Sequence, residues 1–252
     1  MSQAAVSGAL DPEKGAILLV DKPVGWTSFN VVSKVRKTLR KLCGHRVKVG
    51  HAGTLDPLAS GLLVIGTGSC TKQLQTLADE DKRYVAVLRL GQTTASYDSE
   101  MPVEVELPWA QIGVAEVQAV LPQFTGAIMQ RPPDFSAKRF EGERAYHLAR
   151  KGEHVDLPPV ALTVHSIELI GFQGPEVTLD VYCSKGTYLR SLAHDIGQAL
   201  GCGAHLSALR RTASGNLQVG DARTPEQWSE WFDVWVLTRN TPLGVPAWPK
   251  EV

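Results

Sequence analysis

One carboxylate in this chain stands in a turn whose sequence suits chemistry. The run 49–61 reads VGHAGTLDPLASG, so Asp56 lies among Gly, Thr and Pro, and the apolar run Leu62–Ile65 follows. A carboxylate fixed on a turn against an apolar strand is partly desolvated and held in one direction, as a nucleophile or general base requires. The same aspartate could instead cap its own backbone in an Asx turn. The segment alone leaves both interpretations open.

Motifs for other kinds of chemistry are absent from the sequence. The run Gly66–Lys72, GTGSCTK, resembles a phosphate-binding loop but does not fit GxxxxGK[ST]. No GxGxxG follows a strand, and neither HExxH nor GxSxG occurs. The four cysteines form no CxxC pair, and the lone CxxH at Cys202–His205 does not predict a zinc site. We therefore expect no metal and no cofactor.

Size and composition indicate an ordinary globular protein. The chain has 252 residues, of which 43% are hydrophobic and 21% charged, enough for one full core. Lys plus Arg and Asp plus Glu both number 26, so the net charge predicts no polyanionic partner. The charge is uneven, however, because Lys34–Lys48 holds seven Lys or Arg and no acid, and the sign reverses around Asp98–Glu106. A neutral protein can still present a basic face to phosphates.

No targeting or membrane segment is evident. The run Met1–Gly15 lacks the basic and apolar regions of a signal peptide, and no apolar run approaches the ~20 residues of a membrane span. The scattered cysteines also fit a reducing compartment. We therefore expect a cytoplasmic protein with a flexible N-terminal tail over residues 1–14.

The expected secondary structure mixes strands and helices without a regular βαβ rhythm, which favours an α+β fold with a largely antiparallel sheet. The first helix is expected over 28–42, with Ser28 as its N-cap and Gly44 closing it. Its face opposite the apolar residues carries Lys34, Lys37 and Lys41, which either meet phosphates or form a solvated surface. Two more helices are expected at 113–121 and 189–200, and strands at 16–20, 46–49, 62–65, 82–90, 161–170, 177–184 and 204–212 and from 126 onward.

Several short segments stand out by their composition and order: DKP at 21–23, GHAGTLDP at 50–57, the stretch around Lys72, DKRY at 81–84, SKGTYLRSL at 184–192 and GCGAHLSALRRT at 201–212. Together they resemble the TruB family, tRNA pseudouridine synthases that convert uridine 55 of the T-loop. Each segment alone is weak, but the ordered set runs from about Gly15 to Gly220 and is specific. The resemblance implies a pseudouridine-synthase-like fold with a mixed, largely antiparallel central sheet flanked by helices.

The resemblance also assigns roles to individual residues. By it, Asp56 is the catalytic aspartate, Tyr84 is similar to the residue that stacks on the target base, and Arg190 to the arginine that pairs with the catalytic carboxylate. His51 resembles the histidine that takes the space of the flipped nucleotide. Four further residues match family positions that line or support the pocket or touch RNA: Lys22, Lys72, Tyr188 and Leu209.

Most of these residues also have a purely structural interpretation. Tyr84 could be a core residue of its strand, and His51 could be a hydrogen-bonded turn histidine. Arg190 could pair with Asp195 or cap a helix, and Lys22 could be an ordinary turn lysine.

The resemblance further implies a domain layout. Residues 15–220 correspond to the catalytic domain, and an insertion at about 130–154, which is basic and aromatic, closes on RNA and is expected to be disordered without it. Residues 221–252 are a short extension, so we expect no C-terminal PUA domain. The segment 93–99 resembles a family element usually followed by Gly, but Glu100 stands here, and we expect a local difference in this loop.

The expected partner is the T stem and loop of tRNA, with no membrane, no evident protein partner and a monomeric state. Two alternatives stay open. One is a uridine isomerase that acts on another RNA, and the other is an RNA-binding or tRNA-folding module without catalysis.

Overall fold

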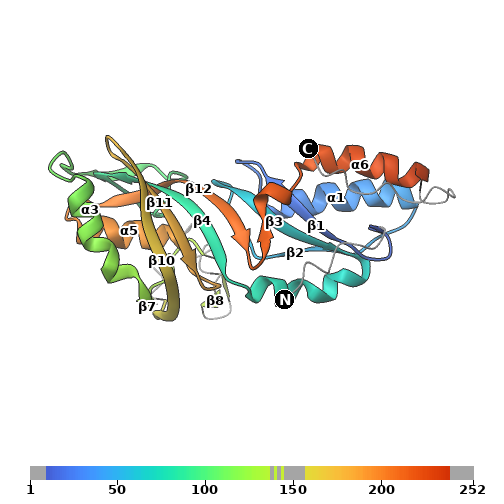
Figure 1. Ribbon diagram of the computed structural model, residues 1–252, viewed down its shortest axis with the longest axis horizontal. Helices are drawn as coiled ribbons and strands as arrows, with labels where there is room; N and C mark the ends of the chain where they lie inside the picture. The colour runs from blue at the N-terminus through green and yellow to red at the C-terminus, as the bar shows by residue number, and fades with distance from the viewer. Residues whose placement is uncertain (1–9, 137–138, 141–142, 145–156, 239–252) are drawn as a thin grey trace. The chain divides into compact units, whose positions relative to one another are not determined.

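The computed structural model describes residues 10–136, 139–140, 143–144 and 157–238 (Figure 1). The chain divides into two compact units. Unit 1 combines Met1–Asp79 with Ala213–Val252, and unit 2 is the continuous segment Glu80–Thr212.

Unit 1 is built around one buried strand. Strand β3 (Ala59–Thr67) pairs antiparallel with β1 (Ile17–Lys22) and with β2 (Val49–Ala52). Its central run Leu62–Ile65 is fully buried, as a continuous apolar run with no polar alternation predicts. Strand β3 leads into the 3-10 helix η1 (Gly68–Gln73). Leu62 and Val64 form a core cluster with apolar residues of helix α2 (Leu74–Asp79), strand β13 (Leu217–Gln218) and η3 (Val219–Asp221), among them Leu74, Leu77, Leu217 and Val219.

Helix α1 (Ser28–Cys43) has the extent that the sequence predicts, but its N-cap differs. Thr27 is the N-cap: its hydroxyl accepts the backbone N–H of Asn30, and the Asn30 side chain accepts the N–H of Thr27. The prediction that Ser28 caps the helix was wrong because its hydroxyl is engaged elsewhere. At the other end Gly44 adopts φ 77°, the left-handed conformation of a helix C-cap.

Helix α6 (Pro225–Thr238) has no counterpart among the predicted elements. It lies beside α1 (Figure 1), and its aromatic side chains Trp228, Trp231, Phe232 and Trp235 are buried. The indole N–H of Trp228 donates to the carbonyl of Leu19 in β1 at 2.8 Å. This helix is therefore part of the core of unit 1.

The structure also corrects the predicted bounds of a strand at 46–49 and of the flexible tail at 1–14. The strand predicted over 46–49 begins only at Val49, because its partner β3 ends opposite it at Thr67 and the chain then turns into η1. In the predicted tail, residues 1–9 lie outside the described part, whereas Asp11–Gly15 forms a turn. This turn is tied to η1 by a bond from the Ser69 N–H to the Lys14 carbonyl.

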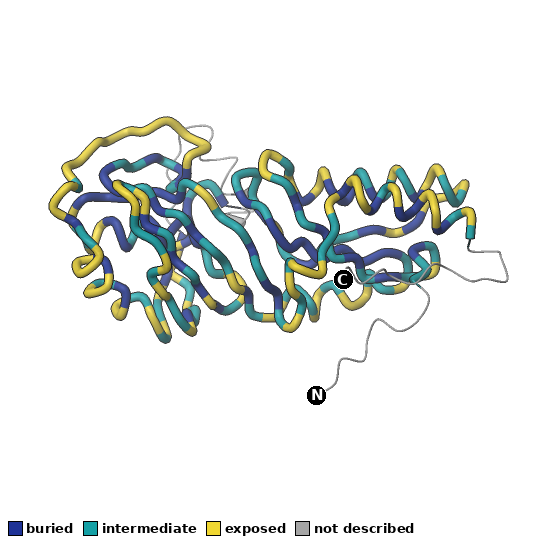
Figure 2. The backbone as a smooth tube through the Cα atoms, turned by 45° about the horizontal axis from the view of Figure 1, so that its top comes forward, coloured by how far each residue is buried: buried dark blue, intermediate teal, exposed yellow. Residues whose placement is uncertain are grey.

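Unit 2 contains a sheet with the strand order β12-β4-β11-β10-β7. From β4 to β7, each strand pairs antiparallel with its neighbour. The strands are β12 (Ala204–Ser214), β4 (Lys82–Leu90), β11 (Glu176–Cys183), β10 (Val160–Gln173) and β7 (Gly126–Gln130). Ala86, Leu88 and Leu90 of β4 are buried, and the residues between them are less buried. Figure 2 shows the buried and partly buried stretches of the backbone. The predicted α+β fold with a largely antiparallel sheet is confirmed.

Helices and short hairpins complete unit 2. Helix α3 (Val114–Val120) continues into η2 (Leu121–Phe124) and contacts β10, whereas α5 (Leu189–Ala199) contacts β4. A Cβ at Gly197 would lie 2.1 Å from the Ala204 nitrogen, so this glycine permits α5 to approach the start of β12. The short pairs are β5 (Gln92–Thr94) with β6 (Val103–Glu106), and β8 (Arg139–Phe140) with β9 (Glu143–Arg144).

The burial of the four cysteines leads to a test of the core. Cys183 and Cys202 are buried, whereas Cys43 and Cys70 are partly exposed, and burial raises the pKa of the Cys183 thiol to about 11. Because the thiolate is the reactive form, we expect a maleimide at mildly alkaline pH to label Cys43 and Cys70 but not Cys183 or Cys202. Peptide mapping by mass spectrometry measures this. The unfolded chain should react at all four thiols, and equal labelling of Cys183 in the native and unfolded states would contradict the described core.

Candidate active site

The Asp56 turn connects β2 to β3 in unit 1. Asp56 is half-buried, its neighbour Leu55 is buried, and the Ala59 N–H donates to the Asp56 carbonyl at 3.1 Å. Gly53 and Gly61, on either side, adopt φ 86° and φ 97°, which only glycine takes readily. The turn therefore follows a path that its glycines make possible, and it carries the carboxylate at its centre.

Two contacts, one from the first residue of α1 and one from the turn before this helix, hold the Asp56 turn on both sides of the aspartate. The Ser28 hydroxyl accepts the Leu55 N–H at 2.8 Å and lies 3.1 Å from the Leu55 carbonyl, to which it can donate. The Gly25 N–H donates to the Pro57 carbonyl at 2.8 Å. The sequence suggested a cap at Ser28, so its role beside Asp56 was missed.

Lys22 lies at the end of β1, and its side chain is fully buried. Its ammonium donates to the carbonyls of Pro23 and Trp26 at 2.9 and 2.5 Å. A buried ammonium is costly unless its donors are satisfied, so Lys22 fixes the turn that leads from β1 into α1. This turn is the one whose Gly25 contacts Pro57.

The two remaining predicted residues of unit 1 differ in exposure. His51 lies in β2 opposite Ile65 of β3 and is half-buried. Lys72 lies in η1, with an exposed side chain. Lys72 is therefore available to solvent and to a polyanion.

In unit 2, Tyr84 lies on β4 opposite Val181 of β11 and is half-buried. Leu209 on β12 is also half-buried. Tyr188 is the residue before α5, and its backbone is held by the buried side chain of Gln130. The Gln130 oxygen accepts the Tyr188 N–H at 2.8 Å, and its amide nitrogen donates to the Tyr188 carbonyl at 3.1 Å.

Arg190, in the first turn of α5, is buried with 7% of its surface exposed. Its guanidinium lies 3.6 Å from Asp98 Oδ2 and donates to the carbonyls of Ser96 and Phe135 at 3.3 and 3.0 Å. These contacts fix the plane of the guanidinium from more than one side. The ion pair is with Asp98, in the segment where the sequence differs from the family element, and not with Asp195 as one alternative suggested.

Asp98 is itself held in place. Its Oδ1 accepts the Ser96 hydroxyl at 2.5 Å and the Glu100 N–H at 3.0 Å. Because Glu100 contributes its backbone here, a glycine at this position could make the same contact. Asp98 was not singled out from the sequence, and only its place in the resembling segment pointed to it.

The predicted residues therefore form two sets. Unit 1 holds Asp56, His51, Lys22 and Lys72, and unit 2 holds Tyr84, Tyr188, Arg190 and Leu209. That the two sets form one pocket stays a prediction. Most of the insertion at 130–154 lies outside the described residues. The prediction that it is disordered without RNA concerns these residues and stays a prediction.

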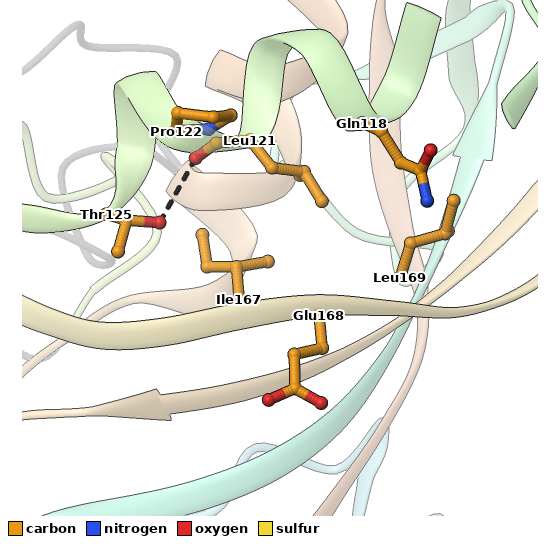
Figure 3. Close-up of a pocket in the computed structure, with 7 residues that line it drawn as sticks. All are labelled: Gln118, Leu121, Pro122, Thr125, Ile167, Glu168 and Leu169. Carbon is orange, nitrogen blue, oxygen red and sulfur yellow. Dashed lines mark hydrogen bonds between the residues drawn. The ribbon is translucent and has the colours of Figure 1, made fainter. Parts of the chain in front are cut away.

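A hollow of about 720 Å³ in unit 2 contains none of the predicted residues (Figure 3). It lies between η2 and β10: the Thr125 hydroxyl donates to the Leu121 carbonyl at 3.2 Å, Ile167 and Leu169 point toward the helices, and Glu168 points away from them. In the described part of the chain, no group of three or more His, Cys, Asp or Glu could hold a metal ion, and no helix is long and apolar enough to cross a membrane.

Replacing Ser28 by Ala tests the anchor of the Asp56 turn. The variant leaves the buried Leu55 N–H without its acceptor, so we expect a loss of about 1–3 kcal/mol in the free energy of unfolding. Urea denaturation measures this loss. Ser33→Ala, on the same helix, should change stability by no more than about 0.5 kcal/mol. Equal effects of the two variants would count against the anchor.

Replacing Asp98 by Asn tests the support of Arg190. The variant keeps the shape of the side chain but removes the charge beside a buried guanidinium, so we expect a loss of about 3–5 kcal/mol in stability. Glu104→Gln, an exposed carboxylate in β6, is the matched control and should be nearly neutral. A neutral result for Asp98→Asn would show that the ion pair is not needed.

The sequence matches known families along most of its length. Residues 40–189 match the family described as TruB family pseudouridylate synthase (N terminal domain), and residues 190–237 match the tRNA pseudouridylate synthase B C-terminal domain. The chain is 47% identical to the tRNA pseudouridine synthase B of Phocaeicola vulgatus over 222 residues, covering 88% of this chain and 94% of the relative. It is also 47% identical to the protein of the same name from Bacteroides thetaiotaomicron over 226 residues, with the same coverage.

A similar structure has been solved. It is the crystal structure of a Cbf5-Nop10-Gar1 complex, with a TM-score of 0.67 and 31% identity. The alignment covers 88% of this chain but only 56% of that chain. Since the first family pattern covers more than half of the sequence, and the bacterial relatives align over nearly all of it, the chain belongs to the TruB family of pseudouridylate synthases.

Proposed function

We propose that this chain is a tRNA pseudouridine synthase that isomerises uridine 55 of the T-loop, with Asp56 as its catalytic carboxylate. The observation that carries the proposal is the half-buried Asp56 on a turn fixed by Ser28 and Gly25, in a chain 47% identical to proteins named tRNA pseudouridine synthase B. A rigid, partly desolvated carboxylate is what a nucleophile or base of this reaction requires.

The reaction sets the demands on the pocket. The bond between N1 of uracil and C1′ of ribose breaks, the uracil turns, and C5 bonds to C1′. C5 then loses its proton and N1 gains one, so the net reaction is an isomerisation and no cofactor is needed. A uracil inside a folded T-loop must first be swung out, at a cost of roughly a few kcal/mol. Stacking on the ring of Tyr84 would offset about 1–3 kcal/mol of this cost.

The charge of Asp56 must be maintained in a dry pocket. Burial alone favours the neutral carboxyl, and a nearby cation favours the ionised form. We assign this role to Arg190, whose guanidinium is already fixed by Asp98 and two carbonyls. A pre-oriented cation needs no rearrangement when the substrate arrives.

The other residues support binding. Tyr188 and Leu209 line the pocket, and Lys22 supports it through the turn that contacts the Asp56 loop. His51 takes the space of the flipped nucleotide, and the exposed Lys72 contacts RNA.

We assign the catalytic domain to residues 15–220, with the RNA-binding insertion at about 130–154 and a short extension at 221–252. The insertion residues outside the described part supply basic and aromatic side chains suited to phosphate contact and stacking. The enzyme acts as a monomer in the cytoplasm, and its partner is the T stem and loop of tRNA.

The test is incubation with unmodified tRNA, followed by mapping of the uridines that become pseudouridine. We expect conversion at position 55, and Asp56→Asn should lower the rate by about 10²–10⁴-fold or more while the T stem-loop still binds. The exposed Asp221→Asn is the matched control and should keep the wild-type rate.

The outcomes separate the alternatives. A tRNA-folding module would keep its whole effect in Asp56→Asn. Conversion of a uridine in another RNA, with none at position 55, would support the proposed isomerisation but reject tRNA uridine 55 as its substrate.

A further inference from the structure

A second surface of unit 1 has the chemistry of a nucleotide-binding site. A hollow of about 510 Å³ lies along the N-terminal half of α1, and its lining includes Trp26, Asn30, Lys34 and Lys37. We call it the α1 hollow. It contains none of the residues that the resemblance assigns to the active site.

The α1 hollow combines an aromatic face with cations. The ammonium of Lys34 lies 5.7 Å from the centre of the Trp26 ring, and Lys37, one turn further along α1, is exposed. Nearby, Val24 and Phe29 expose 65% and 63% of their surface, unusual for large apolar residues. Aromatic faces that stack on bases, together with ammonium groups that meet phosphates, are the signature of a single-strand nucleic-acid surface.

The position of the hollow favours RNA over an acidic protein. Trp26 belongs to the turn whose Gly25 N–H bonds to the Pro57 carbonyl, directly after Asp56. The Trp26 carbonyl accepts the ammonium of Lys22. A polynucleotide that presents one nucleoside to Asp56 must have its neighbours close by, and this turn lies next to that point.

We propose that the α1 hollow binds a second nucleotide of the RNA substrate, with its base against Trp26 and its phosphate at Lys34 and Lys37. This inference rests on the proposed function and extends it from the isomerised uridine to a flanking nucleotide. The assignment gives the basic residues of α1 a definite ligand.

Glu226 of α6 pairs with one of the cations of the α1 hollow. Its Oε1 lies 3.0 Å from the Lys34 ammonium, and both side chains are partly exposed. The hydrogen bond from Lys34 lowers the pKa of Glu226, so its carboxylate is ionised at neutral pH. A phosphate at Lys34 must therefore displace Glu226 or share the ammonium with it.

The test measures the affinity of the protein for a T stem-loop RNA at several salt concentrations. Lys37→Gln should make the salt dependence shallower by about 0.7–0.9 in log affinity per log salt, the contribution of one phosphate. Lys41→Gln, which removes the same charge from the same helix outside the hollow, should leave the slope near that of the wild type. Trp26→Leu should weaken binding by about 5- to 100-fold without changing the slope, because stacking releases no counterions.

Glu226→Gln provides a second, independent test of the contact between Lys34 and phosphate. Because it frees the Lys34 ammonium, it should tighten RNA binding by up to about 5-fold, the range of an exposed ion pair. Unchanged or weaker binding would contradict the contact between Lys34 and phosphate.

The controls separate this inference from the proposed function. Failure of the wild-type protein to bind tRNA or to form pseudouridine would overturn both. Normal pseudouridine formation, with Lys37→Gln and Trp26→Leu binding RNA as Lys41→Gln does, would overturn only the α1 hollow and favour a protein partner there. Since Lys37 is exposed, its variant stays informative even if Trp26→Leu does not fold.

Discussion

The contact between the Ser28 hydroxyl and the backbone of Leu55 anchors the turn that carries Asp56. A carboxylate can be held in one direction only if the backbone that carries it is itself fixed. The hydroxyl comes from the first residue of α1, and the rest of that helix is held by its buried apolar face. The turn is thus anchored to the core through Ser28, which therefore does not cap the helix, and through the bond from the Gly25 N–H to Pro57.

In unit 2 the corresponding group is a cation, the guanidinium of Arg190, which is buried and held in one orientation. Arg190 pairs with Asp98 and donates to the carbonyls of Ser96 and Phe135, and Asp98 is fixed in turn by Ser96 and the backbone of Glu100. A guanidinium has five N–H donors in one plane, so several fixed acceptors set its orientation. Gln130 does the same for the backbone of Tyr188 just before the helix. The side chains that would meet the substrate are therefore supported by others that would not.

The sequence predicted most strands and helices because their apolar spacing is clear. It did not predict caps and element ends that are determined by contacts with residues far along the chain. Thr27 and Ser28 are both good N-cap residues, and only the contact with Leu55 determines which one caps α1. The start of β2 depends on where β3 ends. Helix α6 was missed although its buried aromatic residues have the i, i+3, i+4, i+7 spacing of one helical face, because the exposed apolar residues Val234 and Leu237 blur the contrast with the opposite face. At the site, the resemblance assigned Asp56 and Arg190, whereas Asp98, Gln130 and Ser28 act through contacts far along the chain that no local pattern reveals.

The way the chain is divided has a consequence for its synthesis. Unit 2 is one continuous segment, whereas unit 1 joins the first part of the chain to the last. Helix α6 supplies buried tryptophans to that first part, and one of them bonds to β1. On the ribosome the middle of the chain can therefore finish folding first, while the segment that carries Asp56 must wait for α6 to emerge before its own core is closed.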